Sequence, residues 1–353
     1  MKKMNLTNLL FLSIVTAATA ACSKMEFSPV PQELASSVPG TSVSFSQVVG
    51  YGNKQVDFLI VFDDSNSMLP DLKKLAAGMG DFVASLESSG IDWQMCMTNT
   101  RAMNSVWGYS SDWVGYSPAS GVPAYLLKKG ASNLGSIFEN TVTAMTIGGS
   151  GSADERGLKA TYNHFALSGS NGCYRPGAAL SVILISNEDE RSVGGDPAKV
   201  KANDAVGSLI PLEAEDQPEN VLAMAKNRFG NDVRFTFNSI IVKPGDKSCE
   251  AMQDAASASP SHEGVHYEKL SVLTDGGVGS ICDSSFANNL NTFRDKIVNS
   301  MTHMTLQCVP AAGTVQIKIN GSAFTKFSVS GNILKFNSPL VEGTKIDLAF
   351  DCQ

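Results

Sequence analysis

The sequence lacks several features by which common classes of protein are recognised. It has no run of basic residues and a formal net charge of −7, so it is a poor candidate for binding nucleic acid. Its cysteines form no Cys-x-x-Cys pair, which disfavours a structural zinc site. Its glycine-rich stretch, residues 148–157, lacks the Gly-Lys-Ser/Thr of a phosphate-binding loop. Nucleic acid, structural zinc and nucleotide phosphates are therefore not the ligands we expect.

The first residues form an apolar segment that is too short to cross a bilayer. This segment, Leu9 to Val15, follows two lysines and leads through small residues to Cys22. The order resembles a bacterial lipoprotein signal, so we predict a signal peptide over residues 1–21 and lipid on Cys22. Ordinary cleavage after Ala21 is the alternative. Both take the chain out of the cytoplasm, and an outer-membrane lipoprotein facing the periplasm or the outside is the location we expect.

Residues 22–50 carry several prolines among serines and are expected to be an extended tether.

The number of cysteines agrees with export of the chain from the cytoplasm. If Cys22 carries lipid, six cysteines remain, and an even number in an exported chain indicates disulfides. Six cysteines allow 15 pairings. The pairs that we expect are Cys96–Cys173, Cys249–Cys282 and Cys308–Cys352.

The most informative stretch is an apolar run, Phe58 to Phe62, that ends in Asp63-Asp64-Ser65-Asn66-Ser67. A strand without polar alternation belongs in the middle of a sheet that is covered on both faces, usually a parallel one. Ligands of open α/β sheets bind beyond the carboxyl ends of the strands. Asp63, Ser65 and Ser67 can converge on one point there, and such hard oxygen donors suit Mg²⁺. Helix capping would explain only one of the three.

Apolar strands and amphipathic helices alternate along most of the chain. We predict helices near residues 70–87, 134–147, 157–167, 220–229 and 286–301, and buried strands near 91–98, 179–186 and 233–242. This order predicts an α/β fold with a doubly wound, mostly parallel sheet flanked by helices. From about residue 304, period-two alternation and the turn signal Asn320-Gly321 predict a small C-terminal all-β appendage.

Asp-x-Ser-x-Ser after a buried strand, followed by Met68 and an amphipathic helix, resembles the metal-ion-dependent adhesion site of von Willebrand factor A domains. The stretches ILISNEDERS and GGVGSIC resemble, more narrowly, a group of predicted bacterial lipoproteins with such a domain and a short β tail. The resemblance implies an A domain with a Rossmann-like fold over residues 51–305 and a β module over 306–353. It also implies Mg²⁺, with Mn²⁺ or Ca²⁺ as substitutes, and a role in adhesion or protein binding.

The resemblance further implies a set of ligands. Ser65 and Ser67 would bind the ion directly, and Asp63 directly or through water. A family threonine corresponds to Ser152, with Ser150 as the next candidate, although Ser152 could instead cap the next helix together with Glu155. The family's Thr-Asp is replaced by Ser186-Asn187, so either the neutral amide oxygen of Asn187 or the carboxylate of Asp189, two residues on, would complete the site. The metal residues that we predict are Asp63, Ser65, Ser67, Ser152, Asn187 and Asp189.

Two further stretches have competing interpretations. The acidic triplet 188–190 could bind a Ca²⁺ of its own, but we expect a solvated loop. Residues 101–129 are rich in aromatic side chains. They are either a recognition surface beside the metal or a long loop that packs on its own rings.

These residues predict a binding protein rather than an enzyme. Neutral serine ligands leave the ion electrophilic, so an Asp or Glu carboxylate of a partner protein can replace a bound water. One alternative is a structural envelope protein whose metal braces the fold. Another is a zinc-dependent hydrolase, because His262, Glu263 and His266 match His-Glu-x-x-His. Gly264 and Val265 disfavour the helix which that motif needs.

Overall fold

The computed structural model describes residues 40–48, 55–88, 90–100, 109–146, 155–167, 172–192, 212–231, 233–256, 261–300, 303–337, 340 and 343–353. All of them belong to one compact unit, Leu34–Gln353. The expected signal peptide and Cys22, the residue on which we expect a lipid, lie outside the described residues. Among the helices that are described, none is long and apolar enough to cross a membrane.

A six-stranded, mostly parallel sheet forms the centre of the fold, in the order β4-β3-β2-β5-β6-β7. Its strands are β2 (Gln55–Phe62), β3 (Asp92–Asn99), β4 (Leu127–Lys128), β5 (Ala179–Ile185), β6 (Phe235–Ile241) and β7 (Val278–Ser280). Only the short edge strand β4 runs antiparallel to its neighbour. Strand β2 lies between β3 and β5, and its residues from Val56 to Phe62 are all buried. The mixed α/β fold with a mostly parallel sheet is therefore confirmed.

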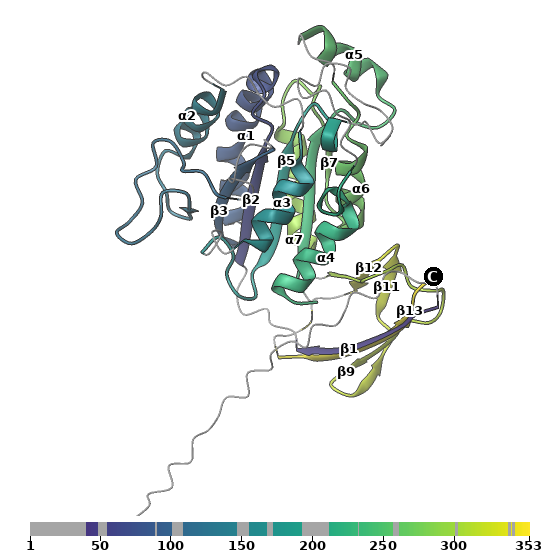
Figure 1. The fold of residues 1–353 in the computed structure, drawn as a ribbon. Coiled ribbons are helices and arrows are strands. Elements are labelled where there is room, and N and C mark those ends of the chain that lie inside the picture. Colours follow the sequence, from purple (N-terminus) through teal and green to yellow (C-terminus); the bar gives the residue numbers. More distant parts are fainter. Residues whose placement is uncertain are drawn as a thin grey trace, which may run out of the picture. The chain divides into compact units, whose positions relative to one another are not determined.

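Helices cover both faces of this sheet (Figure 1). They are α1 (Leu69–Ser88), α2 (Leu134–Thr146), α3 (Gly157–Ala166), α4 (Pro218–Phe229), α5 (Lys247–Ala256), α6 (Val265–Leu273) and α7 (Ala287–Ser300). Phe58 and Ile60 of β2 pack in one apolar cluster with side chains of α1, α2 and α7. Leu59 and Val61 pack in a second cluster with side chains of α3, α4 and α6. Burial on both faces explains why the β2 sequence shows no polar alternation.

The remaining strands form two antiparallel sheets, β1-β13-β9-β10 and β11-β12-β8. The strands are β1 (Ser42–Val48), β8 (His303–Thr305), β9 (Gln316–Ile319), β10 (Ser322–Phe324), β11 (Phe327–Ser330), β12 (Ile333–Phe336) and β13 (Lys345–Asp351). Apolar residues of both sheets share one cluster, in which Val43, Leu334 and Phe350 are buried. The all-β part that we predicted at the C-terminus is therefore present, and β8 begins before the expected boundary at residue 306.

One prediction about this part is wrong. We assigned residues 22–50 to a tether, but Ser42–Val48 form strand β1, which pairs antiparallel with β13 along its whole length. The signal was present in the sequence, because exposed serines alternate with buried Val43 and half-buried Phe45. The all-β part thus takes strands from both sides of the α/β part in the sequence.

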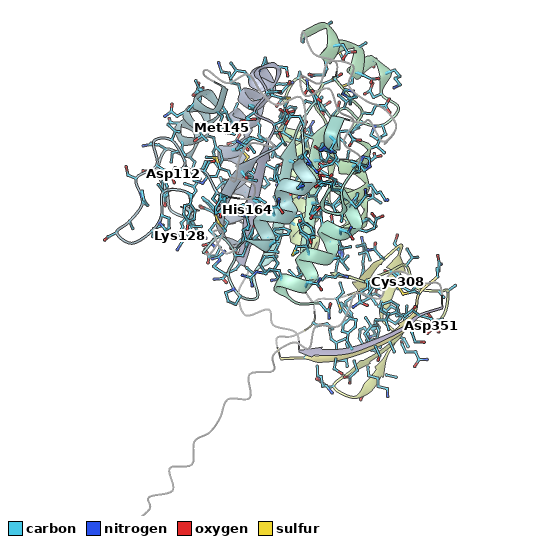
Figure 2. The ribbon with its side chains drawn as sticks, viewed as in Figure 1. Asp112, Lys128, Met145, His164, Cys308 and Asp351 are labelled. Atoms are coloured by element: carbon cyan, nitrogen blue, oxygen red, sulfur yellow. A yellow bond between two sulfur atoms is a disulfide. The ribbon has the colours of Figure 1, made fainter. Side chains whose placement is uncertain are left out.

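Three disulfides join the cysteines of the described chain. They are Cys96–Cys173, Cys249–Cys282 and Cys308–Cys352, the same pairs that we expected. The third links the start of the all-β part to the residue after β13, near the labelled Cys308 and Asp351 in Figure 2. Disulfides persist in oxidising compartments, so these bonds fit an extracellular or envelope protein.

Candidate metal centre

The loop after β2 brings together the first three predicted metal residues. Asp63 is fully buried directly after the strand, where its backbone N–H donates to the Ile185 carbonyl of β5 (3.0 Å). Its Oδ1 accepts a hydrogen bond from the backbone N–H of Ser65 (3.0 Å). The hydroxyl oxygens of Ser65 and Ser67 lie 2.9 Å apart. The loop therefore curls at the carboxyl end of a central strand, which is the condition under which side chains at this spacing can converge.

The end of β5 provides a second contact to this loop. The Ser186 hydroxyl donates to Asp63 Oδ2 (2.7 Å) and accepts from the backbone N–H of Glu188 (3.0 Å). Asn187 lies between these two residues and is 2% exposed. Its Oδ1 makes no hydrogen bond within the described part of the chain. An unsatisfied buried acceptor costs about 1–3 kcal/mol, and an ion bound beside it would remove that cost.

Asp189 is the other residue that could complete the predicted metal site, and its contacts differ from those of Asn187. Its Oδ1 accepts from the backbone N–H of His266 (2.9 Å), and its Oδ2 lies 2.8 Å from His266 Nδ1. Both carboxylate oxygens therefore contact the first turn of α6. Of the two candidates, Asn187 has the oxygen that the described residues leave without a hydrogen bond.

The prediction of a solvated loop for residues 188–190 is wrong, because all three side chains are at most 4% exposed. Glu190 accepts hydrogen bonds from the backbone N–H groups of Leu158 (2.8 Å) and Lys159 (3.0 Å), at the start of α3. A carboxylate at a helix N-terminus satisfies N–H groups that have no partner inside the helix. Asp189 has the same role at α6. The sequence alone suggested a solvated loop because the groups that these acids bind lie far away along the chain.

Sequence analysis missed a further acid at this edge, Glu155, which it considered only as a partner for Ser152 in a cap. Ser152 itself lies outside the described residues. Glu155 is fully buried, and its Oε2 accepts a hydrogen bond from the Thr100 hydroxyl. Its Oε1 makes no hydrogen bond with any described group. Burial, together with the nearby charges of Asp63 and Glu188, raises the pKa of the Glu155 carboxyl well above its usual range.

These residues fit a hard divalent cation. Buried carboxyl groups of like charge are costly unless a cation or hydrogen bonds compensate them. The oxygens gathered here come from carboxylate, hydroxyl and amide groups, which are the ligands of Mg²⁺, Mn²⁺ and Ca²⁺. Within the described residues, no three His, Cys, Asp or Glu side chains are arranged to hold a metal. A cation here would therefore depend on the serine and asparagine oxygens as well as on the acids.

The stretch that matches His-Glu-x-x-His does not have the structure which that motif requires. Helix α6 begins at Val265, so His262 and Glu263 precede it. The Glu263 carboxylate pairs with Lys247 (2.6 Å), and His266 contacts Asp189. The zinc-hydrolase alternative needs both histidines on one helix. That arrangement is not formed, and the alternative loses its structural basis.

The aromatic stretch is mostly packed where it is described. Trp113 is buried, its indole N–H donates to the Tyr125 carbonyl (3.0 Å), and its ring meets Phe138 edge to face (5.2 Å between centroids). Tyr109 is 43% exposed, and Trp107 lies outside the described residues. The described rings therefore favour the interpretation of a loop that packs on aromatic side chains.

Comparisons with known proteins give only distant likenesses. No protein-family model matches the chain, and no curated protein matches it. The pilus adhesin SpaC from Lactobacillus rhamnosus GG aligns at 12% identity over 89% of this chain and 42% of that one, with a TM-score of 0.37. The human COPII-coat protein Sec24c aligns at 12% identity over 88% and 42%, with a TM-score of 0.37.

Proximal thread matrix protein 1 from the mussel byssus aligns at 15% identity over 74% of this chain and 50% of that one, with a TM-score of 0.35. The chain thus spans half or less of each of these three structures. These identities and TM-scores are too low to assign the chain to a family.

Proposed function

We propose that this protein is an exported binding or adhesion protein that recognises a partner protein through a divalent cation, with Mg²⁺ as the preferred ion. The observation that carries the proposal is the Asp63–Ser67 loop at the carboxyl end of the central strand β2. Its carboxylate is fixed by Ser186, and the unsatisfied buried oxygen of Asn187 lies next to Ser186 in the chain. This matches the resemblance to the adhesion site of von Willebrand factor A domains.

In this proposal the residues of the loop hold and orient the ion. Asp63 supplies the negative charge, and its two oxygens are positioned by the Ser65 N–H and the Ser186 hydroxyl. Ser65, Ser67 and Asn187 supply neutral oxygens, and Ser152 is proposed as a further ligand on the resemblance alone. When bound, the cation provides a position at which a carboxylate of the partner can bind. The partner is therefore a protein that presents an Asp or Glu side chain.

The export half of the proposal rests on the signal-like first residues and on the three disulfides. In it, Cys22 carries a lipid that anchors the chain to the cell envelope, at the outer membrane. A chain that binds a partner in this way has no need of catalytic groups, and we propose no enzymatic activity.

The test compares wild type with Asp63→Ala and with a matched control, Asp81→Ala, which removes an exposed carboxylate on α1. Mn²⁺ binding is measured by EPR, and immobilised protein is then used to capture envelope proteins in Mg²⁺ or in chelator. We expect Mn²⁺ binding and Mg²⁺-dependent capture by wild type and D81A, and neither by D63A. Capture that is equal in Mg²⁺ and in chelator for all three proteins would refute metal-mediated recognition. Metal binding that stabilises the fold without any metal-dependent capture would favour the structural envelope protein instead.

A further inference from the structure

We propose that Glu155 is a ligand of the same cation, so that the ion is held by two carboxylates of this chain, those of Asp63 and Glu155. This inference rests on the proposed function, because it concerns the cation of that site. It adds a residue that the Asp-x-Ser-x-Ser pattern does not contain.

The backbone places Glu155 above the end of β2. The N–H of Thr100, just after β3, donates to the carbonyl of Phe62, the last residue of β2 (2.9 Å). The N–H of Arg156 donates to the Thr100 carbonyl (3.1 Å), and the N–H of Arg191 donates to the Glu155 carbonyl (2.5 Å). Glu155 is thus fixed to the segments that follow β3 and β5. Because β2 lies between these two strands, Glu155 lies at the edge where the Asp63 loop begins.

The side chain has one oxygen available to a ligand at this position. Glu155 is fully buried, its Oε2 accepts from the Thr100 hydroxyl, and its Oε1 has no hydrogen bond among the described groups. Its carboxylate is close enough to Asp63, Asp64 and Glu188 for their charges to act on it. A cation between Glu155 and Asp63 would satisfy the buried oxygen and offset the repulsion of the two acids.

The neighbouring acids have other contacts that distinguish them from Glu155. Asp64 Oδ2 accepts from the side-chain amide of Asn99 (3.2 Å). Asp189 contacts the start of α6, and both oxygens of Glu190 contact the start of α3. Among Asp64, Glu155, Asp189 and Glu190, Glu155 is therefore the acid that is best placed to serve the ion together with Asp63.

A second carboxylate changes what the ion can do. With Asp63 alone, a divalent cation keeps a formal charge of +2 − 1 = +1, and with Glu155 as well it keeps +2 − 1 − 1 = 0. The neutral site retains its ion more tightly but attracts a partner's carboxylate less strongly. Glu155 would therefore set the balance between holding the cation and binding the acidic partner.

The test uses Mn²⁺ alone as the probe, in the full chain with its disulfides intact. Mn²⁺ affinity is measured by EPR, and the number of waters on bound Mn²⁺ by water-proton relaxation. Glu155→Ala removes both oxygens of the side chain and leaves room for a water, whereas a glutamine would still offer an amide oxygen to the ion. We expect Glu155→Ala to weaken Mn²⁺ binding by about tenfold or more and to add about one water to the bound ion, since it vacates one ligand position. Glu139→Ala, on the exposed surface of α2, should change neither quantity.

A second variant covers a failure of E155A to fold, which circular dichroism would detect. Thr100→Val removes the hydroxyl that positions Glu155 and keeps the carboxylate. It should weaken Mn²⁺ binding by less than D63A does, while leaving the bound ion without an added water.

The outcomes separate this inference from the proposed function. If D63A abolishes Mn²⁺ binding while E155A keeps the wild-type affinity and water number, the metal site stands and the role of Glu155 is refuted. Weaker binding by E155A without an added water would also refute direct ligation, because Glu155 would then act only through its charge. If the wild-type protein binds no Mn²⁺, the proposed function fails first, and this inference fails with it.

Discussion

Replacing His164 with glutamine should make the protein lose less stability when the pH is lowered. His164 lies on α3 and is labelled in Figure 2. It is fully buried, with Nε2 2.9 Å from the Ser110 hydroxyl and Nδ1 2.6 Å from the Tyr174 hydroxyl. Burial lowers the pKa of His164 from 6.5 to about 3, because the charged imidazolium would lose its hydration there.

The sign and the size of the effect follow from this lowered pKa. Below pH 6.5 the unfolded chain protonates His164, while the folded chain does not until about pH 3. The free energy of unfolding therefore falls as the pH drops from 6.5 toward 3, by about 1.4 kcal/mol per pH unit. Between pH 7 and pH 5, His164 alone should contribute a loss of about 2 kcal/mol.

The assay is urea unfolding of wild type and His164→Gln at pH 7 and at pH 5, with the disulfides intact. The variant loses packing and is expected to be less stable at pH 7, so the quantity of interest is the change between the two pH values. From pH 7 to pH 5, the free energy of unfolding should fall by about 2 kcal/mol less in the variant than in wild type. Equal changes in the two proteins would refute the reasoning, since they would mean that the folded state protonates His164 as readily as the unfolded chain does.

Two other predictions test parts of the fold for which the sequence-based assignment was wrong. Val43→Ala in β1 should lower the free energy of unfolding by about 1.5 kcal/mol, since it removes two buried methyl groups, whereas the exposed neighbour Ser44→Ala should be neutral. An equal effect of the two substitutions would contradict the pairing of β1 with β13. Glu190→Gln should lower stability by about 1–2 kcal/mol and speed hydrogen exchange of the Leu158 and Lys159 amides, which the Glu190 carboxylate binds. Unchanged exchange at those amides would show that this carboxylate does not cap α3.

The sequence predicts the sheet and the Asp63 loop because both signals are local. An unbroken apolar run specifies a strand that is buried on two faces, and β2 has that environment in the structure. The loop follows it within five residues, so the relative placement of Asp63, Ser65 and Ser67 depends on a short piece of backbone. Strand β1 also has a local signal, its alternation. That signal was masked by prolines and serines in the preceding residues, and its partner β13 is some 300 residues away in the sequence.

The contacts that could not be predicted all join distant parts of the chain. Asp189 and Glu190 look alike in the sequence, and each is buried because a helix from elsewhere presents its N–H groups to it.

Glu155 shows the same limit at the proposed metal site. Nothing beside it in the sequence distinguishes it from a capping residue, and only the hydrogen bonds to the segments after β3 and β5 place it over the end of β2. A local motif can therefore point to the loop of the proposed metal site, while the acids that lie beside that loop are determined by the sheet order. For this reason the Glu155 variant, more than any change within the Asp-x-Ser-x-Ser loop, tests what the three-dimensional structure adds to the sequence.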